Sequence, residues 1–116
     1  MSNSWHFYST IKEKTKISLF LEENNIKFDR QHRFDNCKYK RKLPFDFYLP
    51  KYNICVEYDG IQHFESIKYF GGDKKLKYTK INDEIKTKFC NNNKIRLIRI
   101  KYNQDSSDIL NKNIYI

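Results

Sequence analysis

The stretch LPFDFYLPKYNICVEYDGIQHF, residues 43–64, decides the fold that this sequence predicts. Apolar residues alternate with other residues over 45–49, as is typical of a half-buried β-strand. Residues 50–53 are predicted to form a turn, and a second strand covers 54–58. The pair Asp59-Gly60 is a turn signal that ends this second strand. The stretch is therefore expected to be a β-hairpin at the centre of a sheet.

Two carboxylates lie within this hairpin, Asp46 in the first strand and Glu57 near the end of the second. Carboxylates are poor strand residues and are rarely buried without a partner. On neighbouring strands they repel each other unless something positive lies between them. Because Mg²⁺ is typically held by one or two carboxylates with waters and phosphate oxygens, the pair predicts a divalent metal site. Asp59, Gln62 and His63 follow at the same end of the hairpin.

The run from Pro44 to His63 resembles a known nuclease core. Pro44-Phe45-Asp46, followed by Glu57-Tyr58-Asp59-Gly60-x-Gln62-His63, is similar to the PD-(D/E)XK nuclease superfamily. The fuller run resembles its very-short-patch-repair and EDxHD homing-endonuclease subgroup, many of whose members are encoded by phages and large DNA viruses. The similarity covers about residues 17–102. It implies an α/β fold, with a restriction-endonuclease-like mixed β-sheet flanked by helices, and a metal-dependent endonuclease.

The resemblance also implies roles for the acidic cluster. Asp46 and Glu57 would hold Mg²⁺ or Mn²⁺ during hydrolysis of DNA phosphodiester bonds. His63 is the candidate general acid or base, since the unperturbed imidazole pKa is ~6.5. Gln62 would position the water or the phosphate. Asp59 would be either a second metal ligand or the partner of His63, and it stands where the family usually has a lysine.

A second helix, predicted over 74–91 with Asp73 as its N-cap, carries a further part of the resemblance. Its run Asp83-Glu84-x-Lys86 resembles the Asp-Glu-x-Lys element of the same nucleases. The resemblance implies that Asp83 orients His63 or a water, and that Lys86 replaces the lysine missing at position 59. Asp83 and Lys86 are also spaced to form a surface ion pair, which would contribute little.

The first helix departs from the family pattern. The capping signals at Ser9 or Thr10 predict its start, and it is expected to end about residues 24–25. Related nucleases usually carry a glutamate near the start of this helix. That position aligns with Lys14, with Glu13 beside it. A shift of one residue rotates a helical side chain by ~100°, so Glu13 is left out of the predicted site.

The remaining segments follow the same local signals. A strand is expected over 26–34, with residues 26, 28, 30, 32 and 34 on one face, and residues 35–42 are expected to be a basic loop. Another strand is predicted over 95–100, apolar on both faces as in a central strand. A short helix should follow Asp105, and residues 113–116 are expected to form an edge strand.

The overall charge favours nucleic acid as a partner. The chain of 116 residues carries 23 Lys and Arg against 14 Asp and Glu, a formal charge of +9. Such a balance favours nucleic acid or an anionic surface, although a solvated basic surface would have the same composition. The basic loop leads directly into Asp46. The candidate DNA-backbone contacts are Arg30, Arg33, Lys38, Lys40, Arg41 and Lys42.

The bulk properties predict one nuclease domain over residues 1–116, acting inside a cell. The three cysteines are widely spaced without a CxxC pair, which argues against zinc and suits a reducing compartment. No segment has the pattern of a membrane span or a secretion signal. A specific double-strand cutter of this size is expected to act as a homodimer or with a partner. The alternatives are a catalytically inactive nucleic-acid-binding protein of the same fold and an RNA-directed nuclease.

Overall fold

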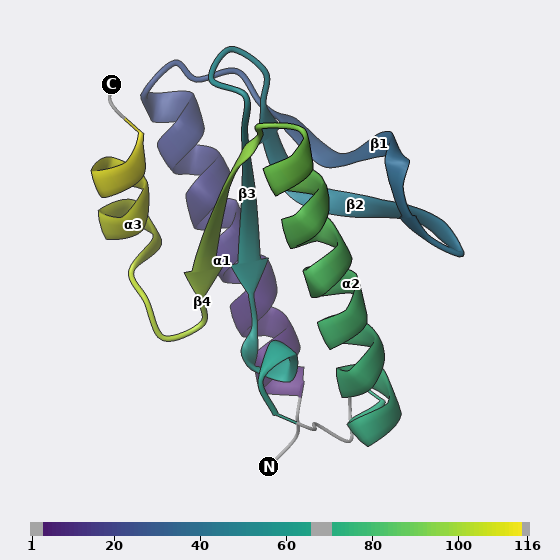
Figure 1. Cartoon of the computed structure of the whole chain (residues 1–116). Helices are drawn as coiled ribbons and strands as arrows, with labels where there is room; N and C mark the ends of the chain where they lie inside the picture. The colour runs from purple at the N-terminus through teal and green to yellow at the C-terminus, as the bar shows by residue number, and fades with distance from the viewer. Residues whose placement is uncertain (1–3, 66–70, 115–116) are drawn as a thin grey trace.

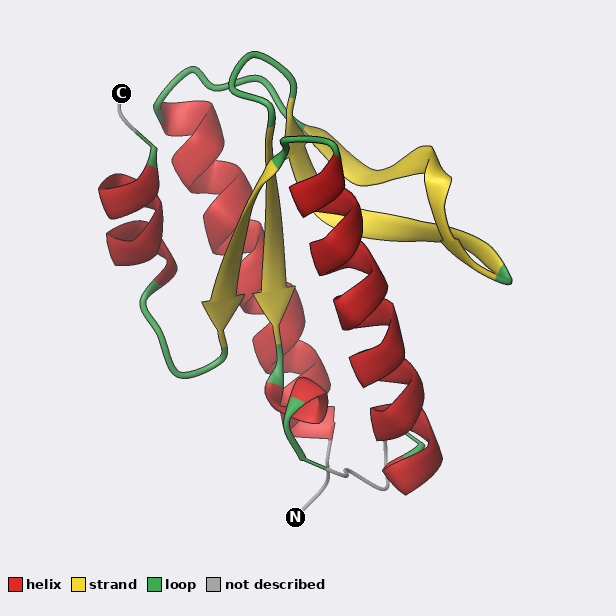
Figure 2. Ribbon diagram, viewed as in Figure 1, coloured by secondary structure: helices red, strands yellow, loops and turns green. Residues whose placement is uncertain are grey.

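The fold is a four-stranded mixed sheet between helices (Figure 1, Figure 2). The structure, a computed structural model, describes residues 4–65 and 71–114. Its sheet has the order β1-β2-β3-β4, with β1, β2 and β3 antiparallel and β4 parallel to β3. This architecture confirms the predicted mixed α/β class. The elements are α1 (Ser4–Glu23), β1 (Asp29–Tyr39), β2 (Arg41–Leu49), β3 (Ile54–Asp59), the short 3-10 helix η1 (Ile61–His63), α2 (Gly72–Asn92), β4 (Arg96–Lys101) and α3 (Ser106–Asn113).

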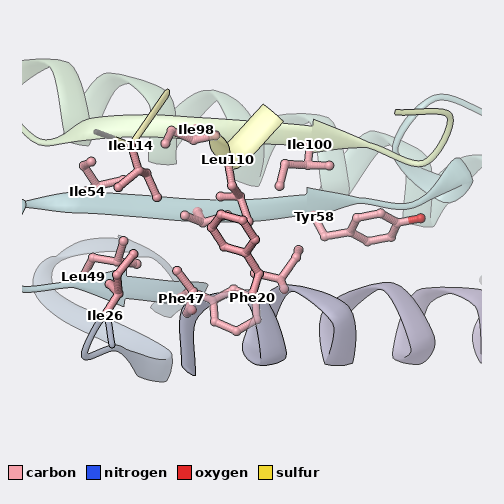
Figure 3. Close-up of a cluster of buried hydrophobic side chains, with 13 residues drawn as sticks. Phe20, Ile26, Phe47, Leu49, Ile54, Tyr58, Ile98, Ile100, Leu110 and Ile114 are labelled. Carbon is pink, nitrogen blue, oxygen red and sulfur yellow. The ribbon is translucent and has the colours of Figure 1, made fainter. Parts of the chain in front are cut away.

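Helices α1 and α3 cover one face of the sheet and α2 covers the other, so the sheet has two apolar cores. Figure 3 shows the α1 side, where Phe20 of α1 meets Phe47 of β2 and Leu110 of α3 points to the same cluster. On the α2 side, Phe45 and Cys55 pack with the helix residue Cys90. All three cysteines are free and buried, and Cys55 is a core residue of β3. Burial on both faces fixes β3 as the central strand of the fold.

The hairpin of β2 and β3 opens at Asp46. Its ladder of paired residues ends at Phe47↔Val56. Opposite Asp46, between the pairs Arg30↔Phe47 and His32↔Phe45, Gln31 has a φ of 51°. This left-handed conformation is costly for a residue with a side chain, and it breaks the alternation of faces along both strands. As a result Phe47 packs on the α1 side whereas Phe45 packs on the α2 side.

The face change corrects two sequence expectations. Residues 26, 28, 30, 32 and 34 do not share one face, because Phe28 packs on the α1 side and Phe34 on the α2 side. The strand also begins at Asp29 and not at residue 26. The segment 35–42 is not a loop, since its residues continue β1 and begin β2 around a turn at Lys40, which has a φ of 65°. The β1–β2 hairpin therefore extends beyond the rest of the sheet, beside α2 (Figure 1).

Several predicted helix ends are also wrong. Helix α1 begins at Ser4, so Ser9 and Thr10 are helical and cannot have the extended backbone of an N-cap. Helix α2 follows Gly71, whose φ of 97° suits glycine, and Asp73 lies within its first turn. Asn113 ends α3 and does not begin an edge strand; residues 115 and 116 lie outside the described residues.

The C-terminal predictions are confirmed in part. Strand β4 has the predicted extent to within one residue and is covered on both faces, with Ile98 and Ile100 on the α1 side and Leu97 on the α2 side. It is not the predicted central strand, because it lies at the edge of the sheet and pairs with β3. Helix α3 starts after Asp105, whose carboxylate accepts hydrogen bonds from the backbone N–H groups of Ser107 and Asp108.

Candidate functional site

Asp46 and Glu57 occupy the fork where β2 leaves β3. Their side chains replace the backbone bonds that the diverging strands no longer make. The backbone N–H of Asp46 donates to Oε2 of Glu57 at 2.6 Å, and the N–H of Tyr58 donates to Oδ2 of Asp46 at 2.8 Å. Both carboxylates are buried. The fork thus holds two acids side by side, as the alternating pattern of the two strands predicted.

A lysine contacts each of these carboxylates. Nζ of Lys14, from α1, lies 2.9 Å from Oδ1 of Asp46. Nζ of Lys86, from α2, lies 2.6 Å from Oε1 of Glu57, and it also lies over the Phe45 ring. The two helices therefore bring one positive charge each from opposite sides of the sheet. The formal charge of the four groups is zero when all are ionised.

Glu57 remains unusually hard to ionise despite Lys86. Burial, followed by the repulsion of the Asp46 carboxylate, raises the pKa of Glu57 to about 7. Lys86 and the N–H of Asp46 oppose this rise. The charged form of Glu57 is thus disfavoured by the nearby Asp46 carboxylate, which is the repulsion expected between acids on neighbouring strands.

A second group of charges lies beside the fork. Nδ1 of His63 is 2.9 Å from Oδ2 of Asp83 and 3.5 Å from Oδ1 of Asp59. Arg99, from β4, contacts Asp59 at 3.1 Å and Asp83 at 3.6 Å, and it donates to the backbone carbonyl of Asp83. Burial raises the pKa of Asp59 above its usual value, although the positive charges of Arg99 and His63 oppose this rise. His63 thus lies between the carboxylates of Asp59 and Asp83, and Arg99 contacts both of these carboxylates.

This arrangement favours one tautomer of His63. Ionised carboxylates only accept hydrogen bonds, so both Asp83 and Asp59 favour a proton on Nδ1. Nε2 of neutral His63 is then a proton acceptor. Asp83 and Lys86 do not pair with each other, because each contacts a different partner. The alternative interpretation, a surface ion pair between Asp83 and Lys86, does not occur among the described residues.

The two groups border one cavity of about 360 Å³, called the carboxylate pocket below. Five of the seven predicted catalytic residues line this pocket. The other two, Asp59 and Asp83, do not line it but contact His63. The pocket is lined by Lys14, Gln31, Pro44, Asp46, Glu57, Tyr58, Gln62, His63, Lys75, Thr79 and Lys86.

Gln62 has a polar atom that the rest of the described chain leaves unused. Its Oε1 is buried and accepts no hydrogen bond among the described residues. A Cβ on Gly60 would collide with that same oxygen, so a side chain at position 60 would displace the Gln62 amide. A buried acceptor without a donor is costly, which suits a group that receives a hydrogen bond from a bound molecule.

The predicted DNA contacts lie on the β1–β2 hairpin and are exposed. Some already have partners in the chain. Arg33 donates to the backbone carbonyl of Lys42, and Lys42 pairs with Asp35 at 2.7 Å. Arg30 lies over the Phe47 ring, at the base of the hairpin. The basic side chains nevertheless remain at the solvent-facing surface next to the strand that carries Asp46.

Sequence reasoning missed two residues of the site. Lys14 was noted only as the position where the family has a glutamate, yet it contacts Asp46. Glu13, which was left out of the predicted site, pairs with Lys16 at 3.0 Å. Arg99 was given no role in the predicted site. An arginine on the α2-facing side of an otherwise apolar strand was the available signal, because such a charge needs an acidic partner.

Both carboxylates of the fork have the chemistry of magnesium ligands, which are hard oxygen donors. The neighbouring set of Asp59, His63 and Asp83 also brings three donor atoms within 4.8 Å of one another. Arg99 contacts both acids of that second set, just as Lys14 and Lys86 contact the two acids of the fork. The fork is the set that the resemblance assigns to a divalent cation.

Comparisons with known proteins leave the family open. No family model matches the chain, and no solved structure matches it. The chain is similar to "Uncharacterized protein 307L" of Invertebrate iridescent virus 6, with 38% identity over 61 residues. That match covers 52% of this chain and 31% of the relative, so the chain spans less than a third of the relative's length. Among the described helices, none is both long and apolar enough to cross a lipid bilayer.

Proposed function

We propose that this protein is a metal-dependent endonuclease that hydrolyses DNA phosphodiester bonds, of the PD-(D/E)XK type with a restriction-endonuclease-like sheet. The observation that carries the proposal is the carboxylate pocket. It combines two buried acids, a histidine with Nε2 as proton acceptor and lysines from two helices in one cavity. The strand order also supports it, since the resemblance implies a hairpin joined by a helix to a parallel strand.

Asp46 and Glu57 would hold Mg²⁺ or Mn²⁺, because their carboxylates are buried, adjacent and open to the same pocket. When bound, such an ion would supply Lewis-acid stabilisation of the charge that develops on the phosphoryl group. The backbone N–H groups of Asp46 and Tyr58 orient the two carboxylates, so binding would require Lys14 and Lys86, rather than the carboxylates, to move.

The side chains around the carboxylates would handle the water and the phosphate. His63 accepts a proton from the attacking water at Nε2, while Asp83 and Asp59 stabilise the imidazolium that forms. Gln62 accepts a hydrogen bond from that water through its unpaired Oε1. Lys86 supplies positive charge beside Glu57, in the role the resemblance assigns to the lysine absent at position 59.

The exposed cations on the β1–β2 hairpin would bind the DNA backbone. They lie on the strands that lead to Asp46, so a duplex contacting them also approaches the carboxylate pocket. Phosphate contacts of this kind position the nucleic acid without reading its sequence. The proposed contacts are those predicted from the sequence: Arg30, Arg33, Lys38, Lys40, Arg41 and Lys42.

A cleavage assay tests this proposal. The parental protein should cut plasmid or linear DNA with Mg²⁺ or Mn²⁺ and stop when EDTA is added, with RNA as a parallel substrate. Asp46→Asn should lose cleavage and keep its fold by circular dichroism, because the amide keeps the shape but not the charge. Asp108→Asn, an exposed acid on α3, is the matched control and should cut normally. Cleavage by Asp46→Asn at the parental rate would refute the site assignment.

A second candidate is a catalytically inactive nucleic-acid-binding protein, and one observation favours it. Each of the four carboxylate oxygens of Asp46 and Glu57 already accepts a bond from the chain, two of them from lysines. A fork neutralised by its own lysines needs no cation for stability. DNA binding without cleavage in either metal would support this candidate.

A further inference from the structure

A second cavity lies between the tip of the β1–β2 hairpin and the first half of α2. Its volume is about 270 Å³. One tyrosine comes from the hairpin and one from the helix, and the rest of the lining is basic or apolar. This cavity is called the tyrosine pocket below, and its lining residues are Tyr39, Lys74, Lys77, Tyr78 and Ile81.

The two tyrosine rings share one ammonium group. Their centroids are 6.2 Å apart, and the rings are inclined at 52°. Nζ of Lys40 lies 5.7 Å from the centroid of Tyr39 and 5.3 Å from that of Tyr78, and it donates to the Tyr78 hydroxyl at 3.3 Å. The left-handed turn at Lys40 brings the hairpin tip to this position. Two partly exposed π-faces and a cation therefore lie in one concave surface.

The charge of the tyrosine pocket is unbalanced. None of its lining residues is acidic. Within residues 4–65 and 71–114, neither Lys74 nor Lys77 forms an ion pair. Clustered cations favour an anion, while aromatic faces favour a flat π-system. A nucleotide supplies both in one molecule, and aromatic stacking beside a basic groove is how single-stranded nucleic acids are bound.

The tyrosine pocket lies next to the carboxylate pocket. Lys75 and Thr79 of α2 line the carboxylate pocket, whereas their sequence neighbours Lys74 and Tyr78 line the tyrosine pocket. The first half of α2 is thus the wall between them, and a helix with its side chains is only about 10–12 Å across. A polynucleotide that crosses α2 can reach both pockets with a few nucleotides.

We propose that the tyrosine pocket binds one unpaired nucleotide of a single-stranded segment. The base stacks on Tyr39 or Tyr78, and the adjoining phosphates contact Lys74 and Lys77. The inference rests on the proposed function in taking DNA as the ligand, but it concerns binding and requires no cleavage. It predicts that the preferred substrate contains unpaired bases near the scissile bond, as in a flap, an overhang or a mismatch.

Fluorescence anisotropy with a labelled thymidine oligonucleotide, without metal, tests the inference. Replacing both pocket tyrosines by leucine should weaken binding at least about fivefold, because the stacking surface is lost. Replacing both by phenylalanine keeps the rings and should leave the affinity unchanged. Tyr8→Leu removes an exposed ring on α1 and is the matched control. With an abasic oligonucleotide, the leucine and parental proteins should bind equally.

Three results would overturn the inference: parental affinity in the leucine variant, an equal loss in the phenylalanine variant, or an equal loss with the abasic oligonucleotide. If the leucine variant unfolds, Lys74→Gln with Lys77→Gln gives an independent test. The slope of log affinity against log salt should then fall by ~0.7 for each phosphate that is no longer neutralised, and an unchanged slope would contradict the inference. If the leucine variant binds the oligonucleotide more weakly as expected but the parental protein does not cleave DNA, only the proposed nuclease activity is refuted. If the parental protein cleaves DNA but the leucine variant keeps its single-strand affinity, only this inference is refuted.

Discussion

Lys14 offers the sharpest test of whether the carboxylate fork takes a divalent cation. Its ammonium lies 2.9 Å from Oδ1 of Asp46, and its side chain is only 26% exposed. A cation bound to Asp46 would have to share that carboxylate with Lys14 or displace it. We therefore expect Lys14→Met, which keeps the length and apolar character of the side chain, to bind Mn²⁺ more tightly than the parental protein.

The magnitude follows from Coulomb's law. Two unit charges 4 Å apart interact with about 1 kcal/mol in bulk water and about 4 kcal/mol near a protein surface. Because Lys14 is partly exposed and can move outward, the lower value applies, doubled to about 2 kcal/mol for a divalent ion. At 1.4 kcal/mol for each factor of ten, the gain in Mn²⁺ affinity is about 30-fold. Lys14→Glu adds a ligand and should gain more.

Calorimetry or Mn²⁺ paramagnetic resonance measures this affinity directly, without reference to cleavage. Lys16→Met is the matched control: it makes the same charge change on the same helix, but its lysine pairs with Glu13, away from Asp46. Unchanged affinity in Lys14→Met, or an equal gain in Lys16→Met, would refute the reasoning. The first result would mean that the fork is not the cation site, and the second that only net charge matters.

Two further predictions concern the protonation of the site. The pKa of Glu57 rises from 4.5 in the unfolded chain to about 7 in the folded protein. Protonation of Glu57 therefore contributes its full stabilisation below pH 4.5, and this contribution is lost as the pH rises through 7. Without metal, the free energy of unfolding should fall by about 3 kcal/mol more between pH 4.5 and 8 in the parental protein than in Glu57→Gln. Chemical denaturation at both pH values measures this, and an equal fall in the free energy of unfolding of the two proteins would contradict it. His63→Ala should slow single-turnover cleavage by ~10²–10⁴ with DNA affinity nearly unchanged, while a parental rate would remove the acid–base role.

The central hairpin could be predicted from the sequence because its signals are local. Alternation over 45–49, a turn at 50–53 and the apolar run from Ile54 each constrain the backbone within a few residues. The adjacency of Asp46 and Glu57 follows from that hairpin alone. The same holds for β4 and α3, whose ends are marked by Lys101 and by the capping carboxylate of Asp105.

The change of face at Gln31 could not be predicted in this way. A left-handed glutamine has no sequence signal of its own, and its conformation is imposed by strand pairing across β1 and β2. The hairpin over 35–42 was missed for a related reason. Its polar residues have weak strand propensity, and they are held in β1 and β2 by pairing with each other, Lys38 with Lys42 and Tyr39 with Arg41.

The charges of the carboxylate pocket suggest how binding events in it depend on one another. Lys14 and Lys86 neutralise the two acids in the protein alone, so a cation competes with them. In the proposed nuclease, a DNA phosphate entering the same pocket would offer these lysines another anion. Each lysine that turned toward the phosphate would free a carboxylate oxygen, so the cation would gain a ligand and lose a competitor. Because such coupling is reciprocal, cation binding would in turn strengthen the binding of DNA. A fork that resists the metal when empty would thus accept it mainly when substrate is present.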